Sequence, residues 1–326
     1  MSKRLAHIPF APAKCPVFYG WPLVGVGALG VLMSVPGQTM GVTVFTDSLL
    51  TNLGLTRDQL SMAYMCGTLG SACLLPYAGR LYDRLGFRAM AVIASLCLAS
   101  VLIVLSRSDV LAGYVAGLLG LAAPVAAYTV IMLGFFALRC WGQGVLTLTS
   151  RNMVAKWFDR RRGLAVGLSG ILTATGFSIA PLALDGLIGH FGWRGAWAAL
   201  AVVIGVFFAF VASALYRDNP EQCGLQPDGR SVEEDHAGSR ETAFEAGWTL
   251  AQARRTRAFW TFSLSLALAA LYTTGLTFYV VSIFEAAGIT RSQAVMTFLP
   301  TSVVALLARP AAGWLSDRLP LSLLLG

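Results

Sequence analysis

The residue best suited to ligand chemistry is an arginine in the middle of a long apolar segment. Arg139 lies well inside residues 128–155, where a charged side chain costs at least about 2.5–3.5 kcal/mol on insertion scales. Gln143 and Thr147 follow at four-residue spacing, so a regular helix would place all three on one face. Because an arginine fork binds a carboxylate through two parallel hydrogen bonds, this face predicts a site for a small anion. The alternative is a structural arginine whose donors bond to carbonyl groups of neighbouring helices.

Three further residues in apolar runs are candidates for the same binding site. Gln38 lies in the first run, Tyr279 in the seventh and Arg309 in the eighth. Each of the last two has a plainer explanation, since Tyr279 can pack between helices and the side chain of Arg309 can reach the membrane surface. No carboxylate lies near the centre of a predicted spanning helix, and the ones nearest to these helices lie towards their outer ends: Asp47, Asp185 and Glu285.

The sequence shows no sign of a catalytic centre, a metal site or a bound cofactor. The six cysteines and three histidines are scattered, with no CxxC pair and no mixed cluster. No glycine-rich loop leads into the Lys-Ser/Thr pair that binds nucleotide phosphates. We therefore expect no cofactor and no metal, and we do not expect an enzyme.

The composition is typical of a chain that is embedded in a lipid membrane. Of the 326 residues, 56% are apolar and 12% are charged, whereas soluble domains have about 45–50% and about 25%. The net charge of +8 would suit nucleic acid in a soluble protein, but basic loops also gather on the cytoplasmic side of membrane proteins. We therefore predict a multi-pass integral membrane protein that lies in the lipid bilayer and does not bind nucleic acid.

The apolar runs predict an all-α membrane protein with two helical bundles. We expect a complete six-helix bundle in 1–216, a polar cytoplasmic linker in 217–257, and a partial second bundle in 258–326. A helix of about 20 apolar residues spans a bilayer. By that measure the spanning helices cover approximately 20–45, 59–78, 89–106, 128–155, 164–188, 195–215, 259–284 and 293–315, and a ninth begins at the end of the chain.

The apolar segment 110–127 is not expected to cross the membrane. The basic loops at 80–88 and 156–162 should both be cytoplasmic, so an even number of crossings separates them. We expect 110–127 to be an outer interfacial helix or a re-entrant hairpin, broken at Pro124. The N-terminus and the linker are then cytoplasmic, and 17 of the 24 Lys and Arg residues lie on the inside.

Two charged turns of similar pattern occur, one in each half of the chain, and each could form part of a gate. Their residues are Gly79, Asp83, Arg84, Gly86 and Arg88 after the second helix, and Gly313, Asp317 and Arg318 after the eighth. A small residue lets helices approach closely, and a carboxylate can accept hydrogen bonds at a helix N-terminus. The arginines can bond across the seam between helices. The turns either hold the inner face closed or only fix the topology.

These turns resemble motifs of the major facilitator superfamily. Its loop motif looks like Gly79-x-Leu81-x-Asp83-Arg84-x-Gly86-x-Arg88, and its second-half copy looks like Gly313-x-Leu315-x-Asp317-Arg318. The segments 135–144 and 191–194 are similar to its fourth-helix motif and its fifth-to-sixth loop. The resemblance implies a secondary transporter of twelve helices, usually monomeric, that moves a small molecule across the cytoplasmic membrane by alternating access.

Within that superfamily, the chain looks most like the monocarboxylate and oxalate/formate carriers. The similar segments are 19–21 (Tyr-Gly-Trp), 156–158 (Lys-Trp-Phe), 217–229 in the linker and 308–310 (Ala-Arg-Pro). Two positions depart from the carriers: Ala305 replaces an aspartate, and Gln38 occupies the region of a lysine. The resemblance implies a mono- or dicarboxylate cargo with a coupling proton or counter-anion. The alternatives are an efflux antiporter for a drug-like or other solute, and a truncated remnant that transports nothing.

The position of 110–127 can be tested by accessibility labelling. In a background without the native cysteines, Gly113→Cys and Ala123→Cys should react with a membrane-impermeant maleimide added from outside. Reaction of either cysteine from the cytoplasmic side alone would contradict the predicted topology.

Overall fold

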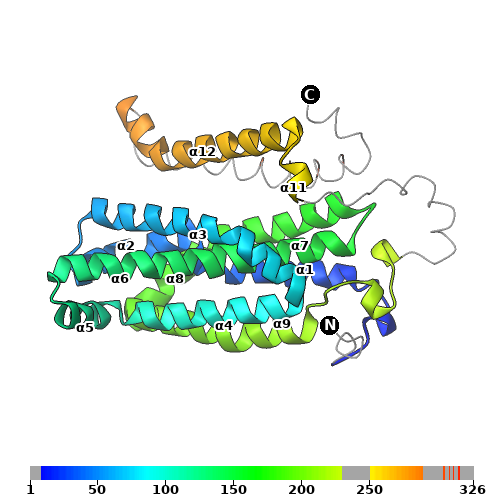
Figure 1. The fold of residues 1–326 in the computed structure, drawn as a ribbon, viewed down its shortest axis with the longest axis horizontal. Coiled ribbons are helices and arrows are strands. Elements are labelled where there is room, and N and C mark those ends of the chain that lie inside the picture. The colour runs from blue at the N-terminus through cyan, green and yellow to red at the C-terminus, as the bar shows by residue number, and fades with distance from the viewer. Residues whose placement is uncertain are drawn as a thin grey trace. The chain divides into compact units, whose positions relative to one another are not determined.

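The computed structural model describes residues 9–229 and 250–288, together with residues 304, 308, 311 and 315. All regular secondary structure in these ranges is helical, which confirms the all-α class (Figure 1). The chain divides into two compact units, whose main described parts are 9–229 and 250–288. The first unit carries most of the candidate residues.

The first unit is a bundle of long helical segments that pack side by side (Figure 1). Helix α3 packs on α6, α4 packs on α8, and α1 packs on both α7 and α8. The bounds of the elements are α1 Gly20–Met33, η3 Val35–Gly37, α2 Thr39–Leu53, α3 Arg57–Leu85, α4 Phe87–Ser106, α5 Ser108–Leu119, α6 Ala123–Leu138, η4 Arg139–Leu146, α7 Thr147–Trp157, α8 Arg162–Val202, η5 Val203–Phe208 and α9 Ala209–Leu215.

The first predicted helix is broken, which corrects the expectation of one helix over 20–45. Helix α1 ends at Met33, a single 3-10 turn η3 follows, and α2 begins at Thr39. Pro36 lies in that turn and has no N–H to donate to a continuing helix. Irregular backbone at membrane depth is tolerated only where protein covers it or where it lines a cavity, and residues 34–37 are buried.

The fourth predicted helix is irregular at the level of this break. The segment Ala123–Trp157 is continuous over 35 residues, but η4 within it is a π-helix. A Cβ placed on Gly37 would lie 2.5 Å from the Leu138 carbonyl oxygen and 2.9 Å from the Gln143 nitrogen. The turn η3, which breaks the first predicted helix, therefore lies directly against the π-helical backbone. Such π-bulges are frequent at functional sites.

The first charged turn is shorter than predicted. Helix α3 begins with a capping box made by Thr56 and Gln59 and continues as far as Leu85. Gly86 follows with φ of 85°, and α4 begins at Phe87. The expected loop over 79–88 is thus reduced to one residue between two helices. A positive φ explains the glycine, because residues with a Cβ rarely adopt it.

The segment after α4 folds as one helix and a turn. Helix α5 packs against α6, and the chain reverses at Gly120, where φ is 63°. The break is therefore at Gly120 and not at Pro124 as predicted, because Pro124 lies in the first turn of α6. Proline fits there because the first-turn N–H has no partner within the helix.

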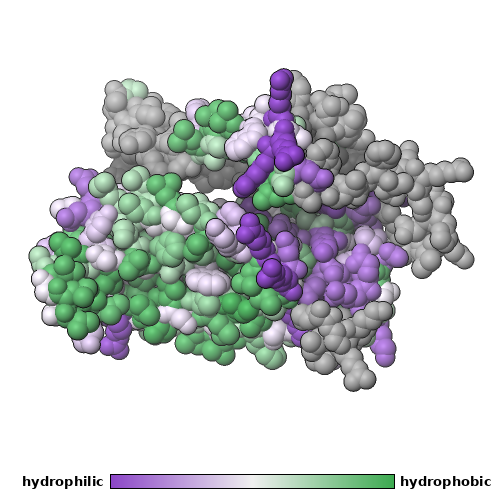
Figure 2. All heavy atoms as spheres, in the orientation of Figure 1, coloured by the Kyte–Doolittle hydropathy of each residue, from purple (hydrophilic) through white to green (hydrophobic). Residues whose placement is uncertain are grey.

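Three helical segments in the described residues are long and apolar enough to cross a membrane: Phe87–Ser106, Ala123–Trp157 and Arg162–Leu215. The third is interrupted at Gly192, whose φ of 68° and ψ of 168° divide it into the two expected helices. Figure 2 shows hydrophobic residues over most of the flank of the first unit, with hydrophilic residues gathered towards its ends. That distribution matches a bilayer with water on both sides.

The second unit contains a short helix, α11 Leu250–Ala253, and a long helix, α12 Arg257–Ala286. Helix α12 agrees with the seventh predicted helix at 259–284. Trp260 donates a hydrogen bond through Nε1 to the Arg254 carbonyl oxygen at 2.9 Å, which joins the start of α12 to the preceding turn.

The contact between η3 and η4 should be intolerant of an added methyl group. We expect Gly37→Ala to destabilise the protein by about 1–3 kcal/mol, because the neighbouring atoms are backbone and cannot move aside. The control is Gly25→Ala in α1, where a Cβ meets nothing within 4 Å and where alanine favours the helix by up to about 1 kcal/mol. Apparent melting temperatures in detergent should separate the two variants, and equal values would contradict the close contact.

Candidate functional site

Arg139 is half-buried beside the break and bonds to neutral groups. Its Nη1 donates to the Tyr64 hydroxyl at 2.7 Å, with longer contacts to the Gly37 carbonyl oxygen at 3.4 Å and the Thr39 hydroxyl at 3.5 Å. The guanidinium carbon lies 5.0 Å from the centre of the Tyr64 ring. Arg139 in η4 thus contacts residues of three other segments, the turn η3, α2 and α3.

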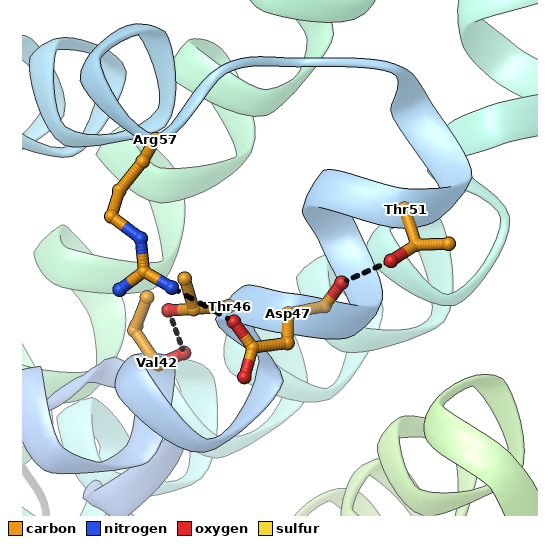
Figure 3. Close-up of polar contacts among 5 residues, drawn as sticks. All are labelled: Val42, Thr46, Asp47, Thr51 and Arg57. Carbon is orange, nitrogen blue, oxygen red and sulfur yellow. Dashed lines mark hydrogen bonds and ion pairs between the residues drawn. The ribbon is translucent and has the colours of Figure 1, made fainter.

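No carboxylate in the described residues neutralises Arg139. The two ion pairs in these ranges are elsewhere, between Arg57 and Asp47 and between Arg194 and Asp109. Figure 3 shows Arg57 of α3 reaching Asp47 of α2, with 3.1 Å between Nη2 and Oδ1. Both side chains are largely exposed, at 72% and 87%, so the pair contributes little to stability. Asp47, the acidic residue nearest in sequence to the break, is therefore engaged away from Arg139.

The other polar candidates of this bundle also lie at the break. The Gln38 amide nitrogen donates to the Ser34 hydroxyl at 2.9 Å and to the Thr147 hydroxyl at 3.3 Å. Thr147 in turn donates to Ser34 at 2.9 Å. The backbone of Gln143 lies against Gly37, and its buried Oε1 has no hydrogen-bond partner among the described residues. The structure therefore brings Gln38, Arg139 and Gln143 together around one turn.

Sequence reasoning missed Tyr64, Thr39 and Ser34 as members of this cluster. Each lies in an apolar run where a single hydroxyl is ordinary, and nothing local shows which helix it faces. The break itself had a signal in Pro36-Gly37, because proline and glycine both disfavour a continuing helix.

The candidates of the second half fall outside the described residues. These are Arg309, Gly313, Asp317 and Arg318, and for Tyr279 only the backbone of α12 is described. Their roles stay as predicted from the sequence.

The carboxylate at the first charged turn comes from an unexpected residue. Asp218 accepts a hydrogen bond from the Arg88 backbone N–H at 3.0 Å, at the start of α4. A Cβ on Gly86 would lie 2.6 Å from this carboxylate. Asp83 and Arg84 are exposed, and no partner is found for either side chain in the described ranges. Asp218 follows the last helix of the bundle. It accepts a backbone hydrogen bond at the N-terminus of α4, which is the role expected of Asp83.

A second aspartate from the same segment holds the other basic turn. Asp228 accepts from the backbone N–H groups of residues 159, 160 and 161 at 3.1, 2.8 and 3.3 Å, just before α8 begins. Its φ of 60° makes it the one non-glycine residue with positive φ in the described ranges. Negative charge is favourable at both places because helix N-termini carry unpaired N–H groups.

Arg217 links this segment to the buried aromatic residues Tyr216 and Trp157 through hydrogen bonds. Arg217 is 1% exposed and donates to the carbonyl oxygens of Ala214 and Tyr216 at 2.7 and 2.8 Å. Its own carbonyl accepts from Trp157 Nε1 at 3.3 Å. Burial lowers the pKa of this guanidinium. Segments 19–21, 156–158 and 217–229, separate in the sequence, therefore meet at one end of the bundle.

The two aspartates should stabilise the protein in the way that helix caps do. We expect Asp218→Ala and Asp228→Ala each to destabilise it by about 0.5–2 kcal/mol, since backbone donors lose their acceptor. Asp185→Ala is the control, because this exposed residue has no partner among those described. Equal melting temperatures for all three variants would contradict a capping role.

Comparison with known families agrees with this architecture. A model described as the Major Facilitator Superfamily matches residues 27–326, which is most of the chain. No match was found among curated proteins. The match includes the break between α1 and α2, the π-helical segment with Arg139 and both charged turns. The chain therefore belongs to the major facilitator superfamily, and it is a membrane-embedded secondary transporter of small molecules.

Proposed function

We propose that the chain transports a small organic anion, such as a mono- or dicarboxylate, and that Arg139 binds it. The observation that carries the proposal is a half-buried guanidinium whose partners in the described residues are all neutral. A charge held within the apolar bundle is costly unless it is paired. A substrate carboxylate would supply the missing charge.

The surroundings of Arg139 suit a site that changes shape. The break between α1 and α2 supplies the Gly37 carbonyl and the Thr39 hydroxyl, and Gln38 and Gln143 lie at the same turn. An anion that binds Arg139 would alter the contacts that this side chain makes among four helical segments. Such differential contacts are what a ligand needs in order to shift an alternating-access equilibrium.

The contact between Arg139 and the Gly37 carbonyl oxygen favours a competing interpretation, in which Arg139 has a structural role. A purely structural arginine would make this bond, and the cargo would then be another solute, as in an efflux antiporter. The longer distance of 3.4 Å, against 2.7 Å to Tyr64, shows that the carbonyl is the weaker partner. We therefore favour the binding role.

The remaining assignments complete the proposal. The protein would act as a monomer in the cytoplasmic membrane, with its N-terminus and linker inside and with a proton or counter-anion as the coupled ion. Arg309 and Tyr279, in the second bundle predicted over 258–326, are candidate substrate-binding residues from the sequence. The charged turns, with Gly79, Asp83 and Arg84 in the first, would form the inner gate.

The proposal is tested by counterflow of labelled acetate, lactate, malonate and succinate in proteoliposomes. We expect at least one of them to exchange, and we expect Arg139→Gln to reduce its uptake about 10–100-fold, because hydrogen bonds to a charged group contribute about 1.5–3 kcal/mol. The control is Arg57→Gln, which changes an arginine to the same residue at the exposed pair in Figure 3.

Uptake that is unchanged in Arg139→Gln would assign this arginine a structural role. Failure of every anion to exchange, with and without a pH gradient, would exclude the proposed cargo.

A further inference from the structure

We infer that Tyr64 is a positioning residue, which holds one nitrogen of Arg139 so that the opposite edge of the guanidinium meets the substrate. The inference rests on the proposed function, because it assumes that Arg139 binds an anion. It adds a residue from a third helical segment, α3, to the binding site and specifies how the arginine is presented.

Within the part of the chain that the structure describes, all the hydrogen bonds of Arg139 are made by a single nitrogen. Nη1 contacts Tyr64, Gly37 and Thr39, whereas Nε and Nη2 have no protein partner in the described ranges. An arginine carries five N–H donors in a rigid plane. With Nη1 engaged, the edge formed by Nε and Nη2 remains as a pair of parallel donors, which is the geometry that a planar carboxylate accepts.

The direction of the hydrogen bonds at Tyr64 is fixed by its second partner. The Tyr64 hydroxyl donates its proton to the Thr39 hydroxyl at 2.9 Å, so it meets Arg139 as an acceptor at 2.7 Å. A hydroxyl has one proton to give, and Tyr64 therefore orients the cation and offers no donor of its own to an anion. The ring of Tyr64 packs edge-on against Phe135, with 5.6 Å between centroids, which restricts its rotation.

This arrangement predicts a preference for planar oxyanions that can accept two parallel bonds. Without the Tyr64 hydroxyl, Nη1 would keep only its longer contacts at 3.4 and 3.5 Å. The guanidinium would then rotate more freely, and part of the binding energy would be spent on ordering it. Substrate affinity should fall, while the conformational steps that set turnover should change little.

The test is Tyr64→Phe in the full chain, with uptake of the exchanging carboxylate measured over a range of concentrations. We expect KM to rise about tenfold, in line with the loss of one hydrogen bond to a charged group, and the maximal rate to change less than about twofold. Tyr77→Phe is the matched control, because Tyr77 is an exposed tyrosine on the same helix and should leave KM unchanged. Thr39→Val removes the acceptor of the Tyr64 proton and should raise KM about threefold, which keeps the test valid if Tyr64→Phe folds poorly.

A double mutant separates positioning from packing. Lysine binds as a point charge and has no edge to orient, so in an Arg139→Lys background Tyr64→Phe should change KM less than about twofold. A tenfold rise in that background would assign Tyr64 a general structural role and overturn the inference. An unchanged KM in Tyr64→Phe, with uptake still dependent on Arg139, would overturn the inference and leave the proposed function standing. No carboxylate uptake by the wild-type chain would overturn both.

Discussion

The close approach of two irregular backbone segments is the constraint on which the bundle depends. Gly37 in the turn between α1 and α2 lies against η4, with no room for a Cβ. Neither segment would be stable facing lipid, because each leaves backbone groups outside a regular helical ladder. Packed together they bury one another, and they place Arg139, Gln38 and Thr147 within reach of the same few hydroxyl and carbonyl groups.

The two ends of the first bundle are fastened by different means. At one end the contact is electrostatic, and Arg194 pairs with Asp109 where α5 adjoins the start of the sixth predicted helix. At the opposite end the contacts are made by backbone donors and buried aromatic rings, and the carboxylates of Asp218 and Asp228 replace the capping residues that α4 and α8 lack. Bonds to backbone N–H groups are directional, so this end is held in a defined geometry and not only by charge attraction.

Hydropathy and charge parity were sufficient to predict the helical class, the positions of most helices and the presence of Arg139 inside the bundle. They could not predict contacts that depend on which residues face one another. Tyr64 is a neighbour of Arg139 only because α3 packs on α6, and Asp218 reaches Arg88 across 130 residues of sequence. The broken first helix was missed because its residues are apolar enough to pass as one span. The predicted break at Pro124 was wrong because proline is as acceptable in a first turn as it is disruptive later.

The path of residues 217–229 bears on how the molecule can be divided. The last helix of the bundle ends at Leu215, so a cut chosen from hydropathy alone would fall at about that point. Such a cut would remove both aspartates that hold the basic turns, and it would leave the N-terminal ends of α4 and α8 with backbone donors facing only solvent. A version of the first bundle meant for expression by itself should therefore extend to Gly229. Residues 217–229 are polar in composition, but by their contacts they are part of the folded unit.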